Sequence, residues 1–413
     1  MNTAAEASRR KSWVLALVLV ALVVRLLSIW HWADYDLTIT HDQGEYFALA
    51  QNVRLHGAFS YGEPHSWGAR AALGAPGPYV PTAARAPFYP LMIAALWWQD
   101  APPLLEVYLV QAVLGIATVL LVYLIALEAF GFTAGLVAGF AMALGPNTAA
   151  ATATLLTETL FTFLLTGCVW LWMRRRGVLA GVTLGVATLT RAVCLPLIGV
   201  VLLLGLVAKL NRPLHLKVAL AALVIVTPWT VRNVVTMHAF IPVNSIGFGA
   251  NLLLGTIDVP YGSGEQFLTF MKDKDFTDIV SSAPTPEEAE RRMAQVAGER
   301  IRAAPLHWFW IRLKHYPRLW IATGSIFSQQ PIVRYTFIAG NIIFWGAAVA
   351  GMALAWRRWR QLYPIAFFPI LLAGAHFTGS GDDRYSLGLV PMAAIFAGFA
   401  LSQLAARIRA APT

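Results

Sequence analysis

Charged residues are scarce in this chain: they make up 13% of its 413 residues, against about 25% in an average soluble protein. Hydrophobic residues reach 58%, and the mean hydropathy is +0.61. The length alone would suggest two or three soluble domains, but this composition predicts one polytopic membrane domain that covers residues 1–413.

Cysteine is also nearly absent. Cys168 and Cys194 are the two cysteines, and both lie inside apolar runs. A disulfide framework or a cysteine metal site is therefore not expected. The sequence has no internal repeat and no low-complexity segment, which argues against a repeat architecture.

Long apolar runs dominate instead and predict an all-α polytopic membrane protein with about ten transmembrane helices. Four of the runs are short for a bilayer, which needs about 20 residues, so the count is ten plus or minus two. The predicted spans are 12–31, 104–127, 133–147, 151–173, 178–191, 194–208, 217–234, 336–356, 362–377 and 386–405.

The net charge of +10 reflects membrane topology. With both termini in the cytoplasm, 14 of the 31 basic residues fall in short cytoplasmic segments, where Glu6 and Glu128 are the acids. This bias follows the positive-inside rule, and nucleic acid is not expected as a partner. The apolar run after SRRK is long and has no cleavage site behind it, so it predicts an uncleaved first helix in the cell (inner) membrane. The basic residues are Arg9, Arg10, Lys11, Arg174, Arg175, Arg176, Lys209, Arg212, Lys217, Arg357, Arg358, Arg360, Arg407 and Arg409.

Two segments, 32–103 and 235–335, are too long to be tight connections and lie outside the cell by the parity of the spans. Loops of this length are usually functional. In the second loop, Thr285-Pro286 followed by acids predicts a helix start. Trp308, Trp310, Tyr316 and Trp320 predict a helix at the membrane interface. We expect this loop to act as a lid or brace on the acceptor side.

The first loop contains THDQGEYFALAQNV, residues 40–53. On a helix, Asp42, Tyr46, Leu49 and Val53 share one stripe. A carboxylate on an apolar stripe costs free energy unless it is paired or used. The alternative is that Asp42 caps the helix, with Glu45 as its capping-box partner.

Arg85 opens the motif RAPFYP at the end of the same loop. Its planar, permanently charged guanidinium suits a phosphate, and Pro87 and Pro90 stiffen the backbone that presents it. The alternative is an arginine that reaches toward lipid headgroups.

Glu158 lies about seven residues into the predicted span 151–173, or roughly 10 Å at the helical rise. An ionisable residue at such depth normally faces a partner or a wet cavity. Arg25, Arg191 and Arg232 are the candidate partners. A buried structural ion pair is the alternative for each, and the one we favour for Arg25.

Two further motifs, PWTVRN with Arg232 and GDDRY with Asp383 and Arg384, lie at outer ends of spans. Acids and arginines thus converge on one face of the bilayer from five segments, although either motif could also be an interfacial anchor.

No ATP is available outside the cell, so an activated donor must arrive through the membrane. A sugar linked to a lipid phosphate fits, because transfer to a hydroxyl needs one base and cationic groups for the leaving phosphate.

The chain resembles the GT-C superfamily of polyprenyl-phosphate-sugar transferases, in particular protein O-mannosyltransferases and lipid A aminoarabinose transferases. The resemblance covers nearly the whole chain and rests on the order and spacing of several motifs. In chain order these are HDQGEY, RAPFYP, LLTETLFTFLL, LTRAVCLP, PWTVRN, GANLLLGT and DRYSLGLVP.

The resemblance implies an inverting glycosyltransferase that moves a sugar from a polyprenyl-phosphate donor to a lipid, glycan or protein hydroxyl. Asp42 would be the general base or orient the acceptor, Glu45 would assist, and Glu158 would be the second acid. Arg85 and Arg384 would bind the donor phosphate. The predicted supporting residues are His41, Tyr46, Arg191, Arg232 and Asp383.

Two questions stay open at this point. Only some GT-C enzymes use a divalent metal ion. Whether Mg or Mn bridges Asp42 or Glu45 and the phosphate is therefore open. The rival functions are a transporter or flippase of lipid-linked sugar and an oligosaccharide polymerase or ligase. The absence of a repeat disfavours a transporter, and a polymerase or ligase would not predict the early helix with Asp42 and Glu45.

Overall fold

A computed structural model describes residues 3–34, 42–62, 77–207, 211–259, 268–321, 331–379 and 383–410. Within these ranges every regular element is a helix, which confirms the predicted all-α class. The bundle helices are α1 (Thr3–Trp32), α4 (Leu104–Phe130), α5 (Phe132–Leu144), α6 (Pro146–Ala150), α7 (Glu158–Met173), α8 (Gly177–Thr190), α9 (Leu195–Val207), α10 (Arg212–Met237), α17 (Pro331–Ala355), α18 (Trp359–Phe377) and α19 (Val390–Ala410).

Each of the ten predicted spans overlaps one or two of these helices. Among the described residues, five helical stretches are long and apolar enough to cross a membrane, or six if the bent pair α5–α6 counts as one span. Three shorter apolar helices cover Glu158–Met173, Gly177–Thr190 and Ala192–Val207. The chain is therefore a multi-pass membrane protein, and the number ten stays a prediction.

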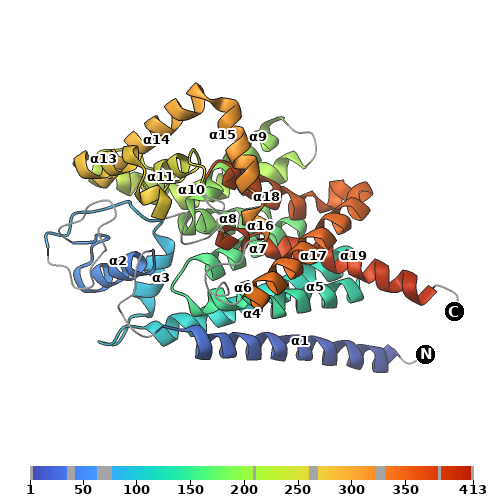
Figure 1. Cartoon of the computed structure of the whole chain (residues 1–413). Coiled ribbons are helices and arrows are strands. Elements are labelled where there is room, and N and C mark those ends of the chain that lie inside the picture. Colours follow the sequence, from blue (N-terminus) through green and yellow to red (C-terminus); the bar gives the residue numbers. More distant parts are fainter. Residues whose placement is uncertain are drawn as a thin grey trace.

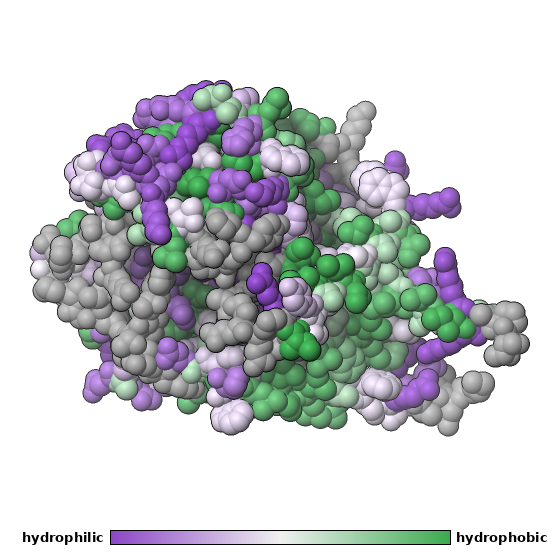
Figure 2. All heavy atoms as spheres, in the orientation of Figure 1, coloured by the Kyte–Doolittle hydropathy of each residue, from purple (hydrophilic) through white to green (hydrophobic). Residues whose placement is uncertain are grey.

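The two termini lie close together at one end of the bundle, and α2 (Asp42–His56) and α3 (Phe88–Leu96) lie at the opposite end (Figure 1). Which end of the bundle faces the cytoplasm stays a prediction from the positive-inside rule. Figure 2 shows hydrophobic side chains along the middle of the bundle. Hydrophilic ones gather over α13 (Lys274–Ser282) and α14 (Pro286–Ala303).

Close helix contacts hold the bundle together, as small residues allow in membranes. A Cβ added at Gly351 of α17 would lie 1.9 Å from the carbonyl oxygen of Phe396 in α19. A Cβ at Gly181 of α8 would lie 2.3 Å from the carbonyl oxygen of Val218 in α10. These two glycines let the backbones of neighbouring helices touch.

The predicted span 151–173 is wrong as one continuous helix. Residues 151–153 form a 3-10 turn, η1 (Ala151–Ala153), and α7 begins only at Glu158. Glu158 is thus in the first turn of its helix, not two turns inside one. The chain also bends before this break, since α5 and the α6–η1 segment make an angle of 56° at Gly145-Pro146.

Arg25 stabilises the end of α5, before the bend at Gly145-Pro146. Its side chain is fully buried in α1, and it donates hydrogen bonds to the carbonyl oxygens of Ala143 at 2.6 Å and Met142 at 3.3 Å. These are orphan carbonyls at the end of α5. The favoured interpretation of Arg25 as one half of an ion pair is therefore wrong, since it caps a helix end.

The second long loop forms a small helical layer with α11 (Phe248–Leu254), α13 and α14. The predicted start of α14 is confirmed: the Thr285 side chain accepts a hydrogen bond from the amide of Glu288, and Pro286 is the first helical residue. Leu253, Phe276 and Met293 form the apolar centre of this layer.

The predicted interfacial helix of the second loop is divided into α15 (Pro305–His315) and α16 (Arg318–Ile321). Pro317 explains the division, because proline removes a backbone donor and disfavours a helical residue before it. Trp308 and Tyr316 both pack their rings against Phe377 at the end of α18. The aromatic residues thus attach this part of the loop to the bundle.

Candidate active site

Asp42 and Glu45 occupy the first turn of α2. As the predicted stripe requires, Tyr46 and Leu49 are buried, and α2 packs on α3. Asp42 and Glu45 remain about one-quarter exposed. The helix therefore buries its apolar stripe and leaves both carboxylates at the edge of the bundle.

Arg85 lies directly before α3 and bridges the two carboxylates. Its Nη2 is 2.6 Å from Asp42 Oδ1, and its Nε is 2.5 Å from Glu45 Oε2. The Tyr61 hydroxyl also donates to Glu45 Oε2, at 3.1 Å. Burial, followed by the charge of Glu45, raises the pKa of Tyr61 well above its usual value, so this hydroxyl keeps its proton and remains a donor.

Arg384 reaches the same carboxylate from the far end of the chain. It lies in a short 3-10 helix, η5 (Asp383–Ser386), and its Nη2 is 2.9 Å from Asp42 Oδ2. Burial alone would raise the pKa of Asp42, but the charges of Arg85 and Arg384 outweigh burial and hold it well below its usual range. Each oxygen of Asp42 therefore bonds to a different guanidinium.

Glu158 forms a second ion pair beside the first. Its Oε1 is 2.9 Å from Nη1 of Arg191, which follows the last residue of α8, and the Glu158 side chain is 5% exposed. Of the three candidate partners of Glu158, Arg191 is the one that binds it in the structure. Because Glu158 is nearly enclosed, the ion pair provides the compensation that a buried carboxylate requires.

Tyr385 lies between the two ion pairs. The guanidinium carbon of Arg384 is 5.1 Å from the centre of its ring and that of Arg191 is 5.2 Å away. The ring of His376 in α18 stacks on Tyr385 with a centroid distance of 4.9 Å. Cations over an aromatic ring are attracted to its π face, so Tyr385 brings both arginines together.

Hydrogen bonds attach α2 to the break before α7. The Gln43 side chain accepts from the amide of Leu155 at 2.9 Å. The Tyr46 ring packs edge-on against Tyr89, whose hydroxyl donates to Gln111, and Gln111 in turn donates to the carbonyl oxygen of Thr152. These contacts fix the position of Asp42 relative to Glu158.

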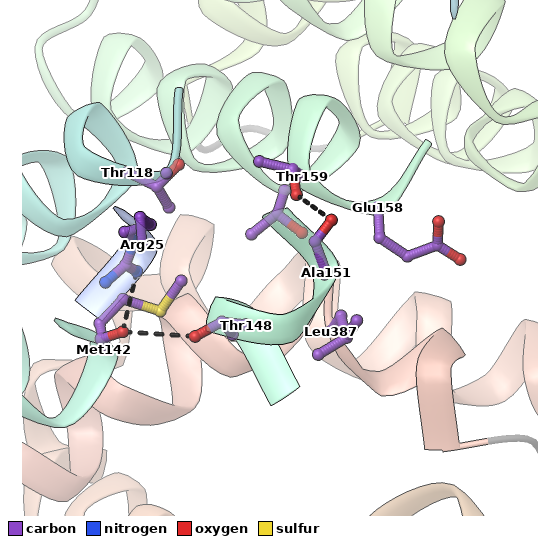
Figure 3. A pocket seen from close by; sticks show the side chains of 10 residues that line it. Arg25, Thr118, Met142, Thr148, Ala151, Glu158, Thr159 and Leu387 are labelled. Atoms are coloured by element: carbon purple, nitrogen blue, oxygen red, sulfur yellow. Dashed lines mark hydrogen bonds between the residues drawn. The ribbon is translucent and has the colours of Figure 1, made fainter. Parts of the chain in front are cut away.

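A small cavity lies on the other side of the Glu158 backbone. Its volume of about 20 Å³ is enough for one water molecule. Figure 3 shows Arg25 and Met142 on one side of this cavity and the Glu158 carboxylate directed away from them. The cavity is thus part of the helix packing, and the Glu158 carboxylate faces Arg191 instead.

The remaining predicted residues differ in whether the structure places them at the site. Tyr46 lies beside the site, with the Arg85 guanidinium carbon 5.6 Å from its ring centre. Arg232 does not join the ion pairs: it donates to the carbonyl oxygen of Thr82 at 2.7 Å and stacks on Trp229. It supports the backbone three residues before Arg85. His41 and the side chain of Asp383 lie outside the described part of the chain.

A divalent metal ion does not fit the ligands that are described. Among these residues, no group of three His, Cys, Asp or Glu side chains could hold one. Both oxygens of Asp42 and Oε2 of Glu45 are bonded to guanidinium groups, which occupy the place of a cation. The predicted Mg or Mn site stays a prediction, and no step below depends on it.

Three residues of this arrangement were not predicted from the sequence: Tyr61, His376 and Tyr385. Tyr385 had a signal, because it follows Arg384 directly in the motif GDDRY. Tyr61 and His376 lie in an ordinary loop and an ordinary apolar helix, and only the tertiary structure brings them to the site.

No protein-family model and no curated protein sequence matches this chain. Solved structures do match its fold. Archaeal oligosaccharyltransferase AglB from Archaeoglobus fulgidus, in complex with an inhibitory peptide and a dolichol-phosphate, has a TM-score of 0.58 and 13% identity, and the alignment covers 99% of this chain and 52% of that one.

The Archaeoglobus fulgidus oligosaccharyltransferase in complex with Zn and sulfate has a TM-score of 0.56 and 13% identity, with 96% and 49% covered. ArnT from Cupriavidus metallidurans bound to undecaprenyl phosphate has 17% identity, with 95% and 78% covered. Its TM-score of 0.42 is too low to support a conclusion. The chain spans about half the length of the oligosaccharyltransferase. The match over nearly the whole chain shows that this chain shares the fold of that oligosaccharyltransferase, and it confirms the predicted fold class.

Proposed function

We propose that this protein is an inverting glycosyltransferase that moves a sugar from a polyprenyl-phosphate donor to a hydroxyl acceptor. The observation that carries the proposal is Asp42 held between Arg85 and Arg384. A carboxylate can accept a proton from a hydroxyl, and two guanidinium groups match a phosphate. The fold of an oligosaccharyltransferase that was solved with a dolichol-phosphate supports this type of donor.

The ion pairs suggest how the donor activates the site. Without donor, the charges of Asp42 and Glu45 balance those of Arg85 and Arg384. The anionic phosphate of the donor competes for the same guanidinium groups and thereby releases Asp42. The free carboxylate then accepts the proton of the acceptor hydroxyl, so the donor must bind before the acceptor reacts.

The transfer itself is one displacement at the anomeric carbon of the sugar. The acceptor oxygen forms a bond to this carbon while the bond to the phosphate oxygen breaks, and Asp42 takes the hydroxyl proton. Polyprenyl phosphate leaves with one more negative charge, which Arg85 and Arg384 stabilise. A single attack opposite to the leaving group inverts the configuration of the sugar.

We place this reaction on the extracytoplasmic face. The support is the arrangement of α2 at the end of the bundle opposite the two termini (Figure 1) together with the basic residues near the termini. Arg191 would hold Glu158 at the second acidic position of the site. The sugar and the acceptor are identified by the experiment below.

The test compares the extracted glycolipids and glycoproteins of a deletion strain that carries wild-type, Asp42→Asn or Glu128→Gln protein. Glu128 is a matched acidic control, because it pairs with Arg174 on the exposed surface at the end of α4. One glycan that lacks a single sugar with Asp42→Asn, and is complete with Glu128→Gln, supports the proposal. Accumulated lipid-linked sugar that Asp42→Asn cures would instead favour a transporter.

A further inference from the structure

Tyr385 contacts both ion pairs of the candidate active site. Its hydroxyl accepts a hydrogen bond from Nη2 of Arg384 at 3.2 Å, and the same nitrogen is 2.9 Å from Asp42 Oδ2. The guanidinium carbon of Arg191, which binds Glu158, is 5.2 Å from the centre of the Tyr385 ring. A displacement of this ring would therefore change the surroundings of both guanidinium groups.

The helix that carries Tyr385 is too short to fix the direction of its ring. η5 has four residues, and the hydrogen-bond geometry of a 3-10 turn is poorer than that of an α-helix. The amide of Leu387 donates to the carbonyl oxygen of Arg384 at 3.3 Å, which is long for a backbone hydrogen bond. We therefore expect side-chain contacts to determine where the Tyr385 ring lies.

His376 provides such a contact from α18. The rings of His376 and Tyr385 are stacked, with a centroid distance of 4.9 Å and an angle of 6° between their planes. His376 lies in the last turn of α18, which has 19 residues. The next residue, Phe377, packs against the rings of Trp308 and Tyr316 in the second long loop. Two neighbouring residues of one turn thus contact the loop and the candidate active site.

Close backbone packing holds the same end of α18. Gly255 follows α11, and a Cβ added there would lie 2.3 Å from the carbonyl oxygen of Thr378, the residue after α18. A side chain at position 255 would therefore push the two helix ends apart. Since α11 and α15 both contact this end of α18, the His376 ring is attached to a well-supported turn.

We propose that His376 is a positioning residue for the donor phosphate: its ring holds Tyr385, and Tyr385 orients Arg384 toward the phosphate. The inference rests on the proposed transferase function. It assigns the role to the flat face of the His376 ring and involves no proton transfer. A guanidinium binds phosphate through a planar fork, so a change in its orientation weakens binding although its charge stays.

The experiment compares His376→Ala, which removes the ring, with His376→Phe, which keeps a flat ring without nitrogens. The probe is undecaprenyl phosphate, and the readout is the concentration that gives half of the maximal rise in unfolding temperature of the purified full chain in nonionic detergent. We expect His376→Ala to raise this concentration about 3- to 10-fold, as for the loss of a cation–π contact. His376→Phe should restore the value of the wild type.

A matched control removes one ring from a stacked pair in another part of the bundle. Phe399 of α19 stacks on Phe130 with a centroid distance of 4.1 Å and an angle of 13°, and Phe130 is the last residue of α4. Phe399→Ala should lower the unfolding temperature without ligand and leave the half-maximal concentration unchanged. If it weakened the response as much as His376→Ala, a general loss of packing would explain both, and the inference would be wrong.

Two results with the His376 variants would also overturn the inference. One is an unchanged half-maximal concentration in His376→Ala. The other is a response of His376→Phe as weak as that of His376→Ala, because the ring nitrogens and not the ring face would then be required. Should His376→Ala fail to fold, His376→Leu, which keeps bulk without a flat ring, makes the same test.

Arg384→Gln separates this inference from the proposed function. If undecaprenyl phosphate does not stabilise the wild type, or stabilises Arg384→Gln equally well, the proposed donor site is wrong and the role of His376 is wrong with it. If Arg384→Gln weakens the response and His376→Ala does not, the donor site stands and the role of His376 alone is wrong.

Discussion

The candidate active site and the Arg312 region of α15 both contain buried or partly buried arginines, but they differ in how charge is balanced. In the first, Asp42 and Glu45 engage Arg85 and Arg384. In the second, Arg312 is buried without an acceptor among the described residues. Internally balanced charges can be exchanged for those of a ligand, whereas unbalanced charges need a ligand or another compensation. The same residue type is therefore paired with carboxylates in one place and buried without a described acceptor in the other.

The largest effect is expected for Asp42→Asn. The amide cannot accept the acceptor proton, and a general base contributes about 10²- to 10⁴-fold to a rate. We expect transfer by the purified protein to fall by about that factor while the amount of folded protein is unchanged. Normal transfer by Asp42→Asn would show that the balanced cluster is structural.

Arg85→Ala should affect donor binding next. A hydrogen bond to a charged group contributes about 1.5–3 kcal/mol, so the apparent KM for donor should rise about 10- to 100-fold. Arg85→Lys keeps the charge but not the planar fork, and an intermediate KM is expected. The measurement is a donor titration at fixed acceptor, and an unchanged KM would remove Arg85 from the phosphate site.

The pairing of Asp42 with Arg85 was partly predictable, because each residue lies in a recognisable local sequence pattern. Apolar spacing placed Asp42 and Tyr46 on one helix face, and prolines around Arg85 indicated a stiff loop. What joined them was tertiary structure, since Arg384 reaches Asp42 from more than 300 residues away. The resemblance to GT-C enzymes supplied that connection before the structure did.

The failures have equally local causes. The break before Glu158 was missed because residues 151–157 are apolar and threonine-rich, and hydropathy does not distinguish a helix from an irregular turn. The Gly145-Pro146 pair was the signal available for it. The burial of Arg312 was not predicted. Arg312 lies in WFWIRLKHYPRLW, and basic residues among aromatic ones are typical of an ordinary amphipathic helix.

Stability should distinguish the paired arginine of the second loop from the unpaired one. Arg300→Gln leaves Asp273 and Asp275 without their cation, and since Asp275 is 46% exposed we expect a loss of about 1 kcal/mol. Arg312→Gln removes a buried charge and should be neutral or stabilising. Apparent unfolding temperatures of the two variants test this. A loss of stability in Arg312→Gln larger than in Arg300→Gln would show that Arg312 has a partner in the folded protein.

The smallest effect concerns pH and the balanced cluster. The pKa of Asp42 is lower in the folded protein than its usual value of about 3.9. Its ion pairs therefore stabilise the fold at every pH above that value, and this contribution is lost as the pH falls through the folded pKa. The difference in unfolding temperature between the wild type and Asp42→Asn should be constant from about pH 8 to about pH 5 and shrink below about pH 4. A difference that shrinks near neutral pH instead would mean that Asp42 is already protonated there, and the two arginines would then not hold it as a carboxylate.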